Sequence, residues 1–334
     1  MGASPPTRDV ESDPTTAAAT LSLSGRYAVQ ARQVRAGLEV WASDEGVELR
    51  LVDDRGVVPM AQAAYRGFVA EGIELLVGPY GSDMVRGVAP AVCRAGRLLW
   101  NHGGAADDLA QPLLATVVAP ASTYLHDALA VVRRTGLAEV QVAHGRGPFA
   151  RAVATGAEAQ AAALGLPIRR RGLSGWQPER SLARVAVFFV STFHEEVEAV
   201  AVLRRSGAPV GMIGCVAAGI EAFGARLGDR AEGIVGPAQW LPTEAHAEVG
   251  PSAAEFTRRF EQLAGRTADY PAAQAATAGY LACEAARRGY GSREVHRWHT
   301  STLLGPFALD QRWRQIGLSP VTVQWRDGRR VRLT

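Results

Sequence analysis

The chain has 334 residues, of which 47% are hydrophobic and 21% are charged, a globular composition with room for about two domains. It contains 36 arginines and no lysine, which excludes chemistry that needs a lysine amine, such as Schiff-base catalysis or phosphate binding by a P-loop. The formal net charge of +3 is small and no basic stripe interleaved with aromatic residues is present, so nucleic acid is not an expected partner.

The chain opens with a segment rich in Pro, Thr, Ser and Asp, which cannot bury enough apolar surface to fold, so a disordered tail is predicted over 1–16. The start lacks a basic stretch followed by a long apolar segment, and no later stretch reaches about 18 apolar residues. We therefore expect no membrane insertion and a cytoplasmic location for the chain as written, or an extracytoplasmic location if the true start lies upstream.

From residue 17 onward, short apolar strands alternate with amphipathic helices in two successive series. The first series has strands at about 17–22, 47–54, 73–78 and 97–101, helices at 28–45, 59–71 and 83–95, and a short helix at 105–110. The second has helices at 122–135, 148–164, 194–206 and near 219–227, with strands at 139–144, 185–190, 210–214 and 232–236. Such alternation is typical of right-handed βαβ crossovers, so two Rossmann-like lobes with parallel, doubly wound sheets are predicted.

After Trp240 the pattern becomes helical and then ends in strands. Amphipathic helices are predicted at 252–265, 272–289 and 293–301. The last segment, VTVQWRDGRRVRL, is predicted to form a hairpin that turns at Asp327 and Gly328.

Several segments occur in a recognisable order: LSLSGRYA, then VDDRGVVPMAQAAYRGFVAEGIELLVGPYGSDMVRGVAPAV, then LLGPFALD and VQWRDG. This order, from about residue 20 to the end, resembles the type I periplasmic binding protein superfamily, and within it the leucine/isoleucine/valine-binding receptors of ABC transporters. The resemblance implies an α/β protein without catalytic groups, whose two lobes, joined by a three-segment hinge, close on a ligand. It implies one lobe of 17–117 plus 241–302, another of 118–240 plus 303–334, and hinges near 118, 240 and 303.

The expected partner is a small polar or aromatic organic ligand. The resemblance further implies an ABC transporter permease as a partner, if the chain is a transport receptor. A regulatory partner replaces the permease if the chain is a cytoplasmic ligand sensor of the same fold.

The candidate site consists of the loops at the carboxyl ends of the predicted parallel strands, where ligands of such sheets collect. The resemblance and this rule together select Arg26, Tyr27, Tyr80, Ser82, Asn101, His102, Gly103, Gly104, Ala105, Tyr124, Phe149, Thr192, Phe193 and Val216.

Several of these residues have a specific expected role. Ser82 is predicted to cap the helix at 83–95, and the unpaired backbone amides at the start of this helix could bind an anion. Arg26 can pair with a carboxylate or remain solvated, and Phe149 can face the ligand or the core. In the run from Asn101, the Asn101 and His102 side chains are expected to hydrogen-bond the ligand, while Gly103 lets the backbone approach it.

Two positions depart from what the resemblance implies for receptors of amino acids. An acidic residue after the strand at 210–214 and a hydroxyl residue after the strand at 97–101 would bind the amino acid, but Val216 and Ala105 stand there. The ligand's ammonium group would be left poorly paired, at a cost on the order of several kcal/mol. An amide, a urea derivative, an aromatic compound or an organic acid is therefore a better expected ligand.

An enzymatic alternative rests on the run His102-Gly103-Gly104, which could form the oxyanion hole of an esterase-like hydrolase. That fold needs a G-x-S-x-G elbow, which the sequence lacks. His296 and His299 have helical spacing but no third metal ligand, and no G-x-G-x-x-G follows a strand. We therefore expect no catalysis, no cofactor and no metal.

Overall fold

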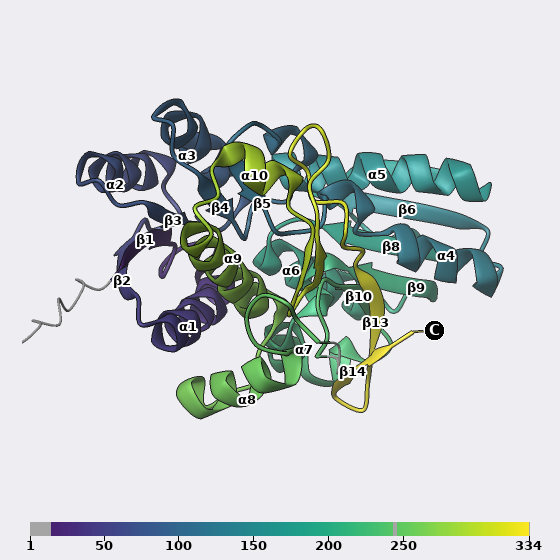
Figure 1. The fold of residues 1–334 in the computed structure, drawn as a ribbon. Coiled ribbons are helices and arrows are strands. Elements are labelled where there is room, and N and C mark those ends of the chain that lie inside the picture. Colours follow the sequence, from purple (N-terminus) through teal and green to yellow (C-terminus); the bar gives the residue numbers. More distant parts are fainter. Residues whose placement is uncertain (1–14, 243–245, 334) are drawn as a thin grey trace, which may run out of the picture.

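In a computed structural model, which describes residues 15–242 and 246–333, the chain forms two large sheets with helices packed against them and a separate pair of short strands (Figure 1). Of the tail predicted over 1–16, residues 1–14 lie outside the described residues. Thr16 is already the first residue of the first strand, so the tail prediction was too long at its end.

The first sheet is parallel and has five strands in the order β2-β1-β3-β4-β5. Its strands are β1 (Thr16–Leu21), β2 (Glu48–Asp53), β3 (Leu75–Val77), β4 (Leu99–Asn101) and β5 (Leu114–Thr116). They are connected through α1 (Ala28–Glu45), α2 (Val58–Ala70), α3 (Ser82–Arg94) and the short 3₁₀ turn η1 (Asp107–Leu109).

The second sheet has seven strands in the order β14-β13-β10-β9-β8-β6-β7. Its strands are β6 (Glu139–His144), β7 (Ile168–Gly172), β8 (Leu182–Val190), β9 (Val210–Cys215), β10 (Val235–Ala238), β13 (Val321–Arg326) and β14 (Arg329–Arg332). Its helical segments are η2 (Ala121–Thr123), α4 (His126–Thr135), α5 (Pro148–Leu164), α6 (Phe193–Ser206), η3 (Val216–Gly219), α7 (Glu221–Leu227) and η4 (Gly228–Ala231). The five strands from β6 to β10 run parallel, and the predicted β13–β14 hairpin adds an antiparallel edge.

The chain returns to the first sheet after β10. The returning elements are α8 (Ala253–Ala264), α9 (Tyr270–Arg287), α10 (Ser292–Arg297) and the strand pair β11 (Thr300–Thr302) and β12 (Gly305–Phe307). Glycines let α9 pack closely along α1, because a Cβ on Gly37 would lie 2.3 Å from the Ala272 carbonyl oxygen and one on Gly279 would lie 2.1 Å from the Trp41 ring. Two separate parts of the chain therefore pack together beside the first sheet.

The prediction of two parallel, doubly wound sheets is confirmed. The short strand β5 has only three residues and was not predicted, and neither was β7, whose sequence IRRRG is mostly exposed and so lacks an apolar pattern. The helix predicted at 293–301 ends at Arg297, and its last two positions belong to β11. The helix predicted at 122–135 is divided between η2 and α4. The prediction that Ser82 caps α3 is wrong, because Gly81 holds the N-cap position and Ser82 is the first helical residue.

Candidate ligand-binding cavity

A cavity of about 370 Å³ lies where the carboxyl ends of the parallel strands of the two sheets face each other. This volume lies within the usual range for small-molecule sites. Most of the candidate residues line it, namely Arg26, Tyr27, Tyr80, Ser82, Gly103, Ala105, Tyr124, Phe149, Thr192, Phe193 and Val216. Asn101, His102 and Gly104 do not.

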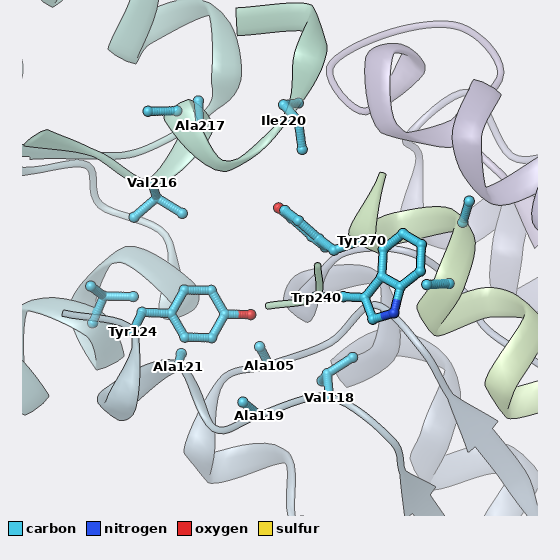
Figure 2. Close-up of a cluster of buried hydrophobic side chains, with 14 of the residues drawn as sticks. Ala105, Val118, Ala119, Ala121, Tyr124, Val216, Ala217, Ile220, Trp240 and Tyr270 are labelled. Atoms are coloured by element: carbon cyan, nitrogen blue, oxygen red, sulfur yellow. The ribbon is translucent and has the colours of Figure 1, made fainter. Parts of the chain in front are cut away.

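Aromatic rings form much of the cavity wall. Tyr27 and Tyr80 from the first lobe pack edge to face at 5.8 Å between ring centroids, and Tyr124 and Phe149 from the second lobe do so at 5.3 Å. In Figure 2 the hydroxyl groups of Tyr124 and Tyr270 point into the same space. The cavity thus combines apolar surface with a few polar groups.

Amide side chains accompany the tyrosines in the cavity wall. Gln274 Nε2 donates to Gln239 Oε1 at 2.8 Å, and both glutamines line the cavity together with Tyr80, Tyr124 and Tyr270. Burial raises the pKa of Tyr270 to about 12 and moves the pKa of Tyr124 well above its ordinary value, so both stay neutral. Gln239, Tyr270 and Gln274 were not predicted, because Gln239 directly follows β10 and the other two lie in the first two turns of α9, and neither segment was among the loops selected for the site.

The loop after β4 is held by its own side chains. The oxygen Asn101 Oδ1 accepts from the amides of Gly103 at 3.2 Å and Gly104 at 2.7 Å, and Ser82 Oγ accepts from the amides of Ala105 and Ala106, both at 3.1 Å. A Cβ on Gly103 would lie 2.6 Å from the Cα of Tyr80, so only glycine fits there. The four amides are thus engaged within the protein, and they are not available as an oxyanion hole.

His102 is buried behind the cavity wall. It is 0% exposed, and within the described part of the chain neither ring nitrogen has a hydrogen-bond partner. Burial lowers the pKa of His102 from 6.5 to about 4, so the ring is neutral at physiological pH. Neither Asn101 nor His102 is placed to supply the direct ligand contact predicted for it.

We predict that His102 makes the protein sensitive to mild acid. Its pKa is lower in the folded state than in the unfolded state, so the unfolded state binds more protons and stability falls as pH drops below about 6.5. Between pH 8 and 5.5 the wild type should lose about 1 kcal/mol more of its free energy of unfolding than His102→Leu does. Urea unfolding of both proteins at the two pH values checks this, and equal losses would contradict it.

Glu196 is a cavity residue that was not among the predicted site residues. It is 1% exposed, and its carboxyl group accepts from the amides of Ser191 and Ala217, each at 2.7 Å. Burial raises the pKa of Glu196 to about 8, although these hydrogen bonds oppose the rise. The neighbouring Glu195 instead forms a capping box with Thr192, the N-cap of α6.

Several charged groups at the cavity edge are paired or bonded within the protein, whereas the exposed Arg146 at the rim forms no ion pair within the described residues. Arg26 forms an ion pair with Asp83 and lies 4.7 Å above the Tyr27 ring, and the Tyr27 hydroxyl donates to Asp83 at 2.5 Å. Arg26 thus has a protein carboxylate beside it rather than being a free cation. The cavity presents mainly neutral polar groups.

Over 15–242 and 246–333, no group of three or more His, Cys, Asp or Glu side chains is placed to hold a metal ion. None of the helices in the same ranges combines the length and apolar character that a bilayer span requires.

Comparison with known proteins gives a consistent result. The sequence profile described as "Periplasmic binding protein" matches residues 14–296. A search of curated proteins finds no match.

Solved structures resemble the whole chain. A leucine-binding protein of Thermotoga maritima aligns with a TM-score of 0.81 at 16% identity, over 96% of this chain and 98% of that one. A branched-chain amino acid transporter substrate-binding protein of Streptococcus pneumoniae, solved with isoleucine, aligns with a TM-score of 0.79 at 15% identity, covering 96% and 100%. An ABC transporter solute-binding protein of R. palustris, solved with benzoate, has a TM-score of 0.78 at 15% identity, covering 96% and 95%. At these identities the similarity establishes the fold.

Proposed function

This chain belongs to the periplasmic binding protein family, and we propose on that premise that it is a transport receptor for a small organic ligand without an α-ammonium group. The observation that carries this proposal is the cavity between the two lobes, in which Val216 and Ala105 face neutral phenol and amide groups. The binding proteins of this family capture solutes, so the chain is expected to work by closure and not by catalysis.

The electrostatics of the cavity support a ligand without a positive charge. Glu196 is the buried acid in the cavity wall, and its raised pKa makes it largely neutral near pH 7. Its oxygens already accept from two backbone amides. The ionised Glu195 at the rim already accepts from the hydroxyl groups of Ser191 and Thr192. An ammonium group would therefore meet no unengaged carboxylate at this end, and the cost of its desolvation would not be offset.

An aromatic or amide ligand suits the remaining wall. The Tyr124 hydroxyl and the Gln239 amide can bond a carbonyl, hydroxyl or carboxyl oxygen, while Tyr80 and Phe149 offer flat apolar surface. The proteins of similar fold include one solved with benzoate and one solved with isoleucine, so the architecture accommodates both ligand types.

We propose the lobe boundaries 17–117 plus 241–302 and 118–240 plus 303–334, with the hinge near Val118, Trp240 and Leu303. The two sheets divide the chain in the same way up to β10. The indole Nε1 of Trp240 donates to the carbonyl of Leu303 at 2.9 Å, which ties two of the hinge segments together. A permease of an ABC transporter is the expected protein partner, and an extracytoplasmic location goes with that role.

The test is a calorimetric titration with matched ligands. Leucine and 4-methylpentanoate differ only in the α-ammonium group, and benzoate, benzamide and phenylurea complete the panel. We expect at least one compound without an ammonium group to bind, and leucine to bind more weakly than 4-methylpentanoate. If leucine were the tightest ligand, the proposed ligand class would be wrong.

We predict that Val216→Glu converts the cavity toward amino acids. A carboxylate at this position would face the ligand's ammonium, and Val216→Gln supplies the same bulk without the charge. Leucine should bind Val216→Glu at least tenfold more tightly than Val216→Gln, a difference of about 1.4 kcal/mol. Equal leucine affinities in the two variants would show that this position does not govern recognition of the ammonium group.

A further inference from the structure

A buried ion pair joins the two proposed lobes outside the ligand cavity. Asp269, the N-cap residue of α9 in the first lobe, is 2% exposed, and the side chain of Arg330 on β14 in the second lobe is 9% exposed. Arg330 Nη2 lies 2.7 Å from Asp269 Oδ1. Among the ion pairs of the described part of the chain, this is the one that connects residues of different lobes.

Further bonds make this pair part of a network. Arg330 Nε donates to Glu221 Oε1 on α7 at 2.9 Å, and Arg330 Nη1 donates to the carbonyl of Gly219. The amide of Glu221 crosses back to Asp269, donating to Oδ2 at 3.0 Å. On the first-lobe side, Gln33 Oε1 of α1 accepts from the Asp269 amide at 3.1 Å.

The network is adjacent to the cavity on both sides. Tyr270, which follows Asp269, lines the cavity from the first lobe, and Gly219 ends the turn η3 that carries Val216 into the cavity from the second lobe. Figure 2 shows Tyr270 facing Val216 and Ile220 across the space between the lobes. An open groove of about 1350 Å³, also lined by both lobes, includes Glu221 and Asp269 in its wall.

The chemistry of the pair favours a role in lobe closure over a purely local one. Asp269 makes no side-chain hydrogen bond that caps its own helix, so its carboxylate is directed to the other lobe. Burial raises the pKa of Asp269 to about 6, and Arg330 opposes that rise. Separating the lobes would leave the buried Asp269 carboxylate without its cation, while Arg330 would keep Glu221 of its own lobe. The closed arrangement avoids that unpaired buried charge.

We propose that Arg330 and Asp269 form a latch that holds the two lobes in the closed arrangement before any ligand binds. Both are positioning residues, because they act on the cavity only through Tyr270 and the η3 turn. The inference rests on the proposed two-lobed closure but not on the identity of the ligand. A receptor with such a latch starts from a larger closed population, so part of the closure no longer depends on ligand contacts.

The test is small-angle X-ray scattering of the full chain without ligand. The wild type should have the radius of gyration that the closed arrangement predicts, and Arg330→Gln and Asp269→Asn should each increase it. The double variant should increase it no further than either single variant, because each substitution removes the same link. Hydrogen exchange at the Glu221 amide, which crosses between the lobes, should accelerate at least tenfold in the same variants.

The neighbouring Arg329→Gln is the matched control, since Arg329 is an exposed arginine of the same strand. It should leave scattering and exchange unchanged. If the substitutions at Arg330 and Asp269 impaired folding, Glu221→Gln, at a half-exposed side chain, should still produce a smaller shift in the same direction. Scattering of Arg330→Gln identical to wild type, or a wild type already open without ligand, would overturn the latch. Neither result would bear on which solute binds, which the calorimetric panel tests separately.

Discussion

Glu196→Ala is expected to lower the free energy of unfolding by about 4 kcal/mol, because buried amides lose their acceptor. The amides of Ser191 and Ala217 both donate to this carboxyl group, and each unsatisfied group costs about 1–3 kcal/mol in addition to the cavity left by the side chain. Urea unfolding measures the change. Ligand binding should be lost as well, since the two loops that the carboxyl group joins carry Thr192 and Val216 to the cavity.

The exposed Glu198 on the same helix provides the control, and Glu198→Ala should stay within about 0.5 kcal/mol of wild type. Glu196→Gln keeps the volume and one acceptor oxygen, so it should recover about half of the lost stability. A cost below about 1 kcal/mol for Glu196→Ala would mean that water replaces the carboxyl group without penalty.

Asn101→Ala is expected to cost about 3 kcal/mol, because a fully buried side chain that makes four hydrogen bonds is removed. The amide nitrogen donates to the Gly104 carbonyl at 2.7 Å and to Thr116 Oγ1 at 3.1 Å, while the oxygen holds the amides of Gly103 and Gly104. The loop would then lose the geometry that places Ala105 in the cavity. Chemical unfolding and titration with the tightest ligand of the panel check both effects.

Thr116→Val separates the contributions, since it removes one of the four bonds and should cost about 1 kcal/mol. If Asn101→Ala kept both stability and binding, the side chain would not be what holds the loop. Retained binding would also show that the Asn101 side chain makes no contact that the ligand needs.

Much of the fold could be predicted because its signals are local. The bounds predicted for the strand at 139–144 and for the helices at 28–45 and 148–164 are those of the structure. Each of these elements has an apolar periodicity of its own and is followed by a glycine that marks its end. β7 was not predicted because it lacks such a local signal. Three consecutive arginines on this edge strand leave no apolar pattern to recognise.

The candidate cavity could be predicted only to the level of its loops. Parallel strands place their carboxyl ends on one edge, so the loops after them collected Tyr80, Ser82 and Val216 correctly around a common space. The same reasoning selected Asn101 and His102, because it cannot tell a side chain that faces the cavity from one that faces the core.

The sequence by itself determined two lobes of parallel strands, the edge at which their loops meet, and the absence of an acid at Val216 and of any lysine, since all of these depend on residue type and local spacing. Only the tertiary structure decided that the amides of the loop after β4 donate to Asn101 and Ser82. The same holds for the burial of Glu196 beside the Ala217 amide and for the ion pair between Arg330 and Asp269. The physical reason is that a buried polar group takes whichever partner the packed chain brings within hydrogen-bond distance. That partner can come from a distant segment, and no local pattern in the sequence marks it.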